Sequence, residues 1–248
     1  MKPRWIVAAT FALLLSAAAE AAEIKVLASG ALREVWAELV PQFEKASGHK
    51  VVATFGATGP MAKRVADGES FDLVIMGQEG IDELVRLNKL VPGTRVELAK
   101  SGVGVAVKAG APKPDISSAE AVKKAVLAAK SLAFSAGASG VYLMRLFEKM
   151  GIADAVKAKT ATVKSGEYVG NVVARGDAEL GFQQVSELVH IKGIEYLGEL
   201  PAEIQNVTVF TGGVPLNAKN PDGGKALSGF LSAPATTPVK KKHGLDPG

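Results

Sequence analysis

Short apolar runs typical of strands alternate along the chain with stretches in which apolar residues recur at helical spacing. In residues 33–47, for example, one face of a helix would carry Val35, Trp36, Leu39, Val40 and Phe43. Short runs of apolar and β-branched residues predict strands at 23–29, 50–55, 71–76, 131–135, 159–165 and 178–184. Helical spacing predicts helices at 33–47, 59–69, 80–90, 119–129, 139–151, 166–176 and 222–233. Two longer extended segments are expected at about 94–108 and 203–214.

The alternation of strands and helices predicts an α/β fold in which helices cover both faces of mainly parallel sheets. The pattern restarts after the Pro-rich stretch "APKPDISS", which indicates a second sheet. We therefore expect two doubly wound lobes joined by two crossing strands, for which the long extended segments are the candidates. Lobe 1 is assigned to residues 22–107 and 210–248, and lobe 2 to residues 108–209.

The first residues have the features of a secretory signal peptide. "MKPRWIVAATFALLLSAAAEAAE" has a basic start, an apolar run of about ten residues and an A-x-A site at residues 19–21. The run is too short to span a bilayer. The sequence predicts a signal peptide at residues 1–21, cleavage near Ala21, and a periplasmic protein.

Composition limits the chemistry. With no cysteine, the chain has neither disulfides nor a thiolate nucleophile, and its formal net charge is only +4. The cluster "KKKHG" at 240–244 is interpreted as the end of a last helix, and no nucleic-acid partner is expected. The three histidines lie far apart in the sequence, are taken as surface residues, and predict no metal site. Asp72 is assigned a structural hydrogen bond.

Four strand-to-helix turns consist almost entirely of small or hydroxyl-bearing residues: 28–31, 56–59, 134–142 and 163–170. Ligands of open α/β sheets bind at the carboxyl ends of the strands, where free N–H groups at helix starts attract anions. A single such turn is ordinary, since any tight turn favours Gly and Ser. Four of them, two in each half, predict a cleft that holds a small anion by amides and hydroxyls.

Several motifs in this order resemble the type 2 periplasmic solute-binding proteins. They are "VLASGAL", "FGATGPMAKRVADGESFDLVIM", "SAGASGVYLMRLFEKMGI" and "VARGDAELGFQQVSEL". The chain is most similar to the branch of molybdate-binding proteins of ABC importers. The resemblance covers nearly all of the mature chain, and it implies two lobes that close on an oxyanion by hinge motion. It also implies a monomer without a cofactor whose partners are the ligand and an importer's membrane permease.

Carried over residue by residue, the resemblance assigns ligand contacts to a set of small and polar residues: Ser29, Gly30, Ala31, Thr58, Ser139, Gly166 and Gln184. The family's first turn has two adjacent serines where this chain has Gly30 and Ala31, and a tyrosine of the family is replaced by Gln184. These changes predict a roomier pocket that suits a small polycarboxylate as well as a molybdate-like oxyanion.

Aconitate isomerase is a relative of these binders, so an enzyme is the alternative function. Moving a proton across an allylic unit requires a positioned base and a cationic group. The candidates are Glu167, Tyr168, Arg33 and Lys63, each of which also suits an exposed helix surface. An inward-pointing Arg33 or Lys63 would favour the isomerase. A neutral cleft would favour the binder, which has no catalytic residues. A sensory binding protein that presents its closed form to a membrane receptor is a third possibility.

Overall fold

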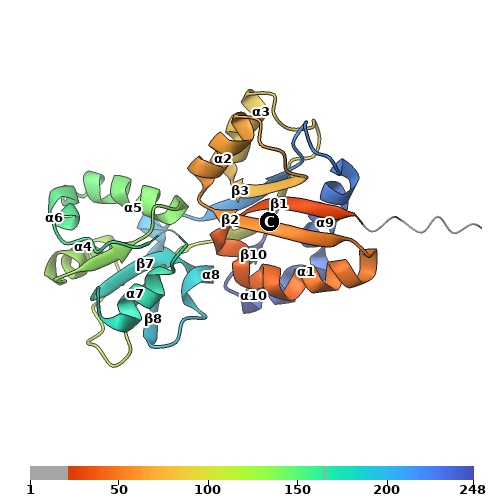
Figure 1. Cartoon of the computed structure of the whole chain (residues 1–248). Helices are drawn as coiled ribbons and strands as arrows, with labels where there is room; N and C mark the ends of the chain where they lie inside the picture. The colour runs from red at the N-terminus through yellow and green to blue at the C-terminus, as the bar shows by residue number, and fades with distance from the viewer. Residues whose placement is uncertain (1–21, 165) are drawn as a thin grey trace, which may run out of the picture.

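Two lobes, each built around its own β-sheet, make up the computed structural model, which describes residues 22–164 and 166–248 (Figure 1). The predicted signal peptide lies outside the described residues. Within them, no helix is both long and apolar enough to cross a bilayer. The mixed α/β architecture predicted from the alternating pattern is confirmed.

Lobe 1 has a six-stranded sheet in the order β10-β4-β9-β3-β1-β2. Its strands are β1 (Glu23–Ser29), β2 (Lys50–Gly56), β3 (Leu73–Gly77), β4 (Val96–Ser101), β9 (Thr208–Gly213) and β10 (Asp246–Pro247). The strands β1, β2 and β3 run parallel, whereas β9 is antiparallel to both β3 and β4. The carboxyl ends of β1, β2 and β3 therefore lie at one edge of the sheet.

Helices cover both faces of this sheet because successive side chains of a strand point to opposite faces. One face carries α1 (Arg33–Ser47), α9 (Pro221–Ser232) and α10 (Thr237–Lys242), and the other carries α2 (Thr58–Ala66) and α3 (Gln78–Arg86). In β1, Val26 packs in the first core and Leu27 in the second. The basic run at 240–242 ends α10, and Gly244 follows with a φ of 71°, as the helix-end interpretation predicted.

Asp72, at the start of β3, ties three segments of lobe 1 together. Its buried carboxylate accepts hydrogen bonds from the backbone N–H groups of Lys25 (2.8 Å), Lys219 (2.9 Å) and Asn220 (2.7 Å). The predicted structural role of Asp72 is confirmed.

Lobe 2 has a four-stranded sheet in the order β6-β7-β5-β8. The strands are β5 (Val103–Lys108), β6 (Leu132–Phe134), β7 (Leu180–Gln184) and β8 (Ile194–Glu199). The helices are α4 (Ala119–Ala128), α5 (Ala138–Lys149), α6 (Ala153–Lys157), α7 (Val169–Arg175) and α8 (Val185–Leu188). Helices α4, α5 and α6 enclose one core, and α7 encloses the other. Because β6 and β7 are parallel, their carboxyl ends also lie at a common edge.

The chain passes between the lobes twice, at Gly102 and between β8 and β9. Gln205 holds the two passages side by side, because its side chain accepts from the Val103 N–H (2.9 Å) and donates to the Val103 carbonyl (3.2 Å). Both extended segments predicted to join the lobes therefore do so. The switch of sheets comes at Gly102, earlier than the predicted boundary at 107/108, because β5 pairs with β7 and β8 of lobe 2.

One predicted strand is absent from the described residues. Residues 159–164 form no strand, and Thr160 makes only an isolated bridge to Leu132 on β6. The apolar alternation there has another cause: Ala161 and Val163 pack against the core beneath α7. The Ser165 part of that prediction lies outside the described residues.

Candidate anion site between the lobes

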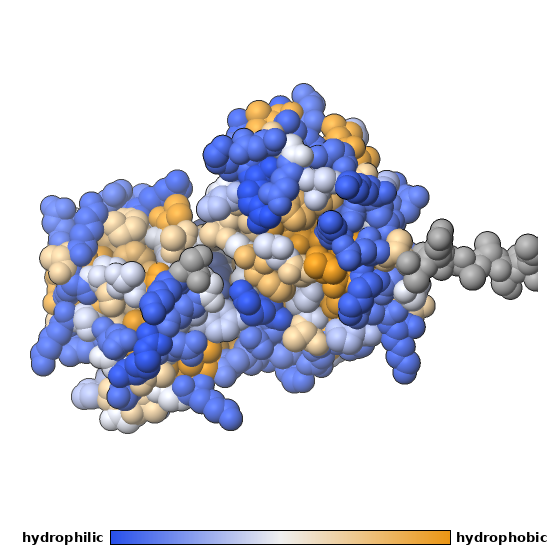
Figure 2. Space-filling view, in the orientation of Figure 1, coloured by the Kyte–Doolittle hydropathy of each residue, from blue (hydrophilic) through white to orange (hydrophobic). Residues whose placement is uncertain are grey.

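A cleft of about 420 Å³ opens between the two lobes, and Figure 2 shows the surface hollowed there. The structure brings all four predicted turns to this cleft. Lobe 1 contributes residues 29–33 after β1 and residues 55–60 after β2, and lobe 2 contributes residues 135–139 after β6 and the segment before α7. Each turn leads into a helix, and the first three also end a strand, so helix starts from both lobes lie at the cleft.

All seven residues predicted to contact the ligand line this cleft. The hydroxyl oxygen of Ser29 accepts from the Ala31 N–H (3.4 Å), and that of Thr58 accepts from the Gly77 N–H (3.0 Å). In both cases the hydroxyl proton remains available to a bound anion, because the protein uses only the oxygen as an acceptor. Their contacts with a ligand stay a prediction.

The start of α5 presents amides to the cleft from lobe 2. The Ser135 hydroxyl accepts from the Gly137 N–H (3.2 Å), and Gly137, the N-cap, offers α5 no side-chain cap. The turn requires glycine at 140, because a Cβ there would lie 1.6 Å from the Ser135 carbonyl oxygen. The sequence "SAGASG" therefore shapes a tight turn whose N–H groups at 138 and 139 face the cleft.

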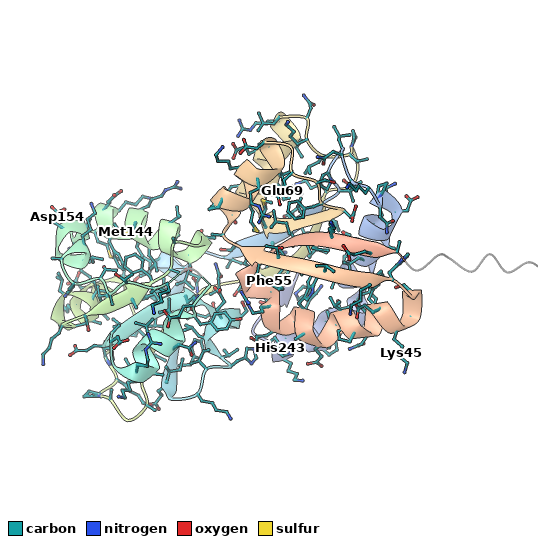
Figure 3. All side chains as sticks on the ribbon, in the orientation of Figure 1. Lys45, Phe55, Glu69, Met144, Asp154 and His243 are labelled. Carbon is teal, nitrogen blue, oxygen red and sulfur yellow. The ribbon has the colours of Figure 1, made fainter. Side chains whose placement is uncertain are left out.

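Arg33 is the cationic group that lobe 1 contributes to the cleft, and Lys164 lies on the lobe 2 side. It is the first residue of α1, and its guanidinium carbon lies 4.7 Å from the centre of the Phe55 ring and 5.9 Å from that of Tyr168. Figure 3 labels Phe55 at the end of β2, on the side of lobe 1 that faces lobe 2. Among the described residues, the buried Nε of Arg33 has no hydrogen-bond partner. A buried donor without a hydrogen-bond partner is costly. A bound anion that accepts a hydrogen bond from this Nε would remove that cost.

Glu187 on α8 faces the same cleft and was not singled out from the sequence. Its carboxylate lies beside Gly30, where an added Cβ would be 3.5 Å from Oε1. Burial raises the pKa of Glu187 to about 7, although the charge of Arg33 and a hydrogen bond with Gln183 lower it. Gln183 is itself fixed, because its Oε1 accepts from the Val169 N–H (2.7 Å). The cleft thus contains a carboxyl group that gains and loses its proton near neutral pH.

The other three candidates of the enzyme hypothesis differ in their surroundings. Tyr168 lines the cleft and donates a hydrogen bond to Glu34 (3.1 Å); burial first, and then the charge of Glu34, raise its pKa well above the usual value. Glu167 also lines the cleft, but Arg175 binds it (2.7 Å) and lowers its pKa. A carboxylate held as an anion in this way is a weak base.

The structure places Lys63 outside the cleft, with its side chain 76% exposed and paired with Asp67 (2.8 Å). The buried face of α2 consists of Met61, Ala62 and Val65, which turns Lys63 toward solvent. Of the two cations considered from the sequence, the structure therefore brings only Arg33 to the cleft.

Gln184 reaches the cleft wall, yet its amide serves the crossing strands. It donates to the carbonyls of Ser101 (3.0 Å) and Gly102 (3.2 Å) and accepts from the Thr208 hydroxyl (2.8 Å). These contacts fix the end of β7 against both passages between the lobes. A role in positioning the hinge accounts for this residue without a ligand contact.

The expectation of three separate surface histidines is wrong for two of them. Nδ1 of the buried His243 lies 3.2 Å from Nε2 of His190, and its Nε2 lies 2.8 Å from Glu38. His190, just beyond α8 in lobe 2, therefore contacts His243 at the end of α10 in lobe 1, and His243 contacts α1 through Glu38. Figure 3 labels His243 on the part of lobe 1 that lies near lobe 2. Among the described residues no cluster of His, Asp and Glu is suited to a metal ion.

Sequence comparisons agree with this architecture. Residues 24–246 match the family described as "Bacterial extracellular solute-binding protein". The chain belongs to this family. This solute-binding protein is 38% identical over 258 aligned positions to an aconitate isomerase from Pseudomonas sp, with 100% of the chain and 98% of that protein covered. It is 30% identical over 249 positions to the molybdate-binding protein ModA of Azotobacter vinelandii, with 96% of each covered.

Solved structures show the fold of this solute-binding protein independently. The periplasmic molybdate-binding protein of Azotobacter vinelandii superposes with a TM-score of 0.73 at 20% identity, covering 90% of this chain and 98% of that one. The substrate-binding domain of a putative molybdenum ABC transporter from Clostridium difficile gives a TM-score of 0.69 at 22% identity, covering 92% and 100%. The predicted type 2 periplasmic binding protein architecture is confirmed.

Proposed function

We propose that this solute-binding protein is exported and captures a small polycarboxylate anion in the interlobe cleft, for delivery to an ABC importer. Family membership supports a ligand-capturing role. The observation that carries the ligand class is the half-buried Arg33, whose buried Nε has no partner among the described residues.

The cleft differs chemically from one made of neutral donors alone. A guanidinium presents a planar fork that matches a carboxylate with two parallel hydrogen bonds. The hydroxyls of Ser29 and Thr58 lie on the Arg33 side of the cleft, and the amides at the start of α5 are placed to hold a second acidic group from the lobe 2 side. A ligand with two or three carboxylates can reach both sides and so hold the lobes together.

The first test is a thermal-shift and calorimetric panel on the mature protein, with citrate, tricarballylate, trans-aconitate, molybdate, tungstate and sulfate. Tricarballylate is informative because it has three carboxylates and no double bond. Stabilisation by the carboxylates, with little effect of the metal oxyanions, is the expected result. Stabilisation by molybdate and tungstate alone would replace this proposal with an oxyanion carrier.

A second candidate function is isomerisation of aconitate, which Glu187 favours together with Arg33, since an arginine in the cleft was the feature expected of the isomerase. A general base works best when its pKa lies near the working pH, and burial sets that of Glu187 to about 7. In this reaction the Glu187 carboxylate removes a proton from the methylene carbon of cis-aconitate. The electron pair shifts the double bond by one carbon, and the proton returns to the formerly vinylic carbon to give the trans isomer. Arg33 would hold the adjacent carboxylate, on which negative charge develops.

This second function is tested by following cis-aconitate in D₂O by proton NMR. Conversion to trans-aconitate is expected for the unaltered protein, with deuterium at the former vinylic carbon in those molecules for which the proton on Glu187 exchanges with solvent before it returns. Glu187→Gln should lower kcat by about 10²–10⁴-fold. Glu167→Gln, at the carboxylate held by Arg175, distinguishes the two candidate bases. Binding of aconitate without conversion would remove the isomerase and leave the capture proposal standing.

A further inference from the structure

A carboxylate is an unexpected lining for a cleft that holds an anion. Glu187 faces the same space as Arg33, and its Oε1 lies beside Gly30 in the first turn. The resemblance to molybdate binders assigns hydroxyl donors to this turn, whereas this chain leaves room for an acidic side chain. An ionised Glu187 would repel any anion bound at Arg33, because like charges in a site with little water oppose each other's ionisation.

The groups around Glu187 decide how that conflict is resolved. From α1 it faces Arg33, whose positive charge favours the ionised form, and Glu34 lies further along the same helix. From the segment before α7 it faces Tyr168, which stays protonated and is hydrogen-bonded to Glu34. From β7, Gln183 hydrogen-bonds to it.

The remaining ionisable groups nearby are engaged elsewhere. Glu167, on the cleft wall, is paired with Arg175, and Lys164 lies at the same rim. Two residues beyond α8, His190 lies against His243 of lobe 1, which in turn contacts Glu38. The charge of Lys164 acts on Glu167, whereas Arg33 is the cation that favours an ionised Glu187 among the described residues. When a ligand neutralises Arg33, Glu187 loses that stabilisation.

We propose that the cleft takes up its anion together with one proton, which Glu187 carries as a neutral carboxyl group that donates a hydrogen bond to the ligand. This inference rests on the proposed capture of a polycarboxylate and adds a specificity determinant to it. Protonated, Glu187 supplies the donor that Gly30 lacks. Ionised, it rejects the ligand, so the cleft releases its anion as the pH rises.

Titration calorimetry with tricarballylate tests this directly, since the probe cannot undergo an allylic shift. Repeating each titration in two buffers of different ionisation enthalpy gives the number of protons taken up. With a pKa of about 7 in the empty cleft, uptake at Glu187 should be about 0.9 proton per ligand at pH 8 and about 0.1 at pH 6. The Kd should be about tenfold higher at pH 8 than at pH 6.

Variants separate Glu187 from other titrating groups, including the ligand. Glu187→Gln should lose the difference in proton uptake between pH 6 and 8, leaving only the ligand's own ionisation, and should bind with a nearly constant Kd. His190→Gln is the matched control, because it removes a nearby titratable group that does not line the cleft; its uptake should equal that of the unaltered protein. Glu187→Asp, which retains a carboxyl group, should keep the linkage.

The outcomes distinguish the two proposals. If tricarballylate binds but the unaltered protein takes up no more protons at pH 8 than at pH 6, the proton linkage is overturned and the capture function stands. If uptake persists in Glu187→Gln, the proton resides on another group and the assignment to Glu187 is overturned. If no polycarboxylate binds at pH 6, both proposals fail together.

Discussion

Arg33 offers the sharpest test of the capture function. Arg33→Met removes the guanidinium but keeps an unbranched apolar stem that can still pack on Phe55. The Nε of Arg33 has no hydrogen-bond partner among the described residues, so the substitution breaks no hydrogen bond made by this nitrogen. The melting temperature without ligand should therefore change little. The loss should appear only when a ligand is present.

The size of that loss follows from the geometry of the pair. Truncating one partner of a buried charged hydrogen-bonded pair costs about 2–5 kcal/mol, which is roughly a 30- to 4,000-fold increase in Kd. A ligand at 100 times its Kd stabilises the unaltered protein by about 2.7 kcal/mol, or about 5–11 °C in a chain of this size. At the same concentration, the variant should gain at most about 0.9 kcal/mol, or less than about 4 °C.

The assay is thermal unfolding followed by circular dichroism, with and without tricarballylate. Arg86→Met is the matched control, because Arg86 is an exposed arginine at the end of α3 and does not line the cleft. The reasoning is refuted if Arg33→Met keeps more than half of the ligand-induced shift. It is also refuted if Arg86→Met loses as much, since the effect would then come from net charge alone.

Three further predictions concern the scaffold. Asp72→Ala removes the charged acceptor of three part-buried backbone N–H groups and should lower the free energy of unfolding in urea by about 3–6 kcal/mol with ligand affinity unchanged; a loss below about 1 kcal/mol would contradict it. Gly140→Ala forces a Cβ against the Ser135 carbonyl and should cost about 1–3 kcal/mol or more and weaken ligand binding by calorimetry; unchanged affinity would show that this turn is not part of the site. Burial and His243 hold the pKa of His190 below 6.5, so the unfolded chain binds more protons and stability should fall as the pH drops from about 7 to 5. Urea midpoints across this range should fall less for His190→Gln, and an equal fall would contradict the assignment.

The sequence predicted the scaffold well because its elements each bury one face. The apolar spacing of α1 matches the core that contains Trp36 and Phe43, and three of the four small turns lie at the carboxyl ends of strands, where the fold makes a cleft. The same reasoning could have excluded Lys63. The buried stripe of α2 leaves it on the outer face, four residues before its partner Asp67.

What the sequence did not reveal depends on contacts between distant segments. Helix α8 has only four residues, too few for a periodic pattern, so Glu187 had no signal apart from its place just after the strand motif "LGFQQ". Its role emerges only where lobe 2 meets Gly30. The contact of His190 with His243 likewise joins residues 53 positions apart, and no local pattern encodes it.

The way the chain is divided between the sheets has a consequence for how the protein folds. Every strand of the lobe 2 sheet comes from the continuous stretch 103–199, whereas the lobe 1 sheet inserts β9 between β3 and β4. Chains emerge from synthesis or translocation N-terminal end first. The edges of β3 and β4 that β9 covers therefore stay unpaired until about a hundred further residues have appeared. We expect lobe 2 to form first, and lobe 1 to pass through a stage in which open strand edges favour aggregation or chaperone binding.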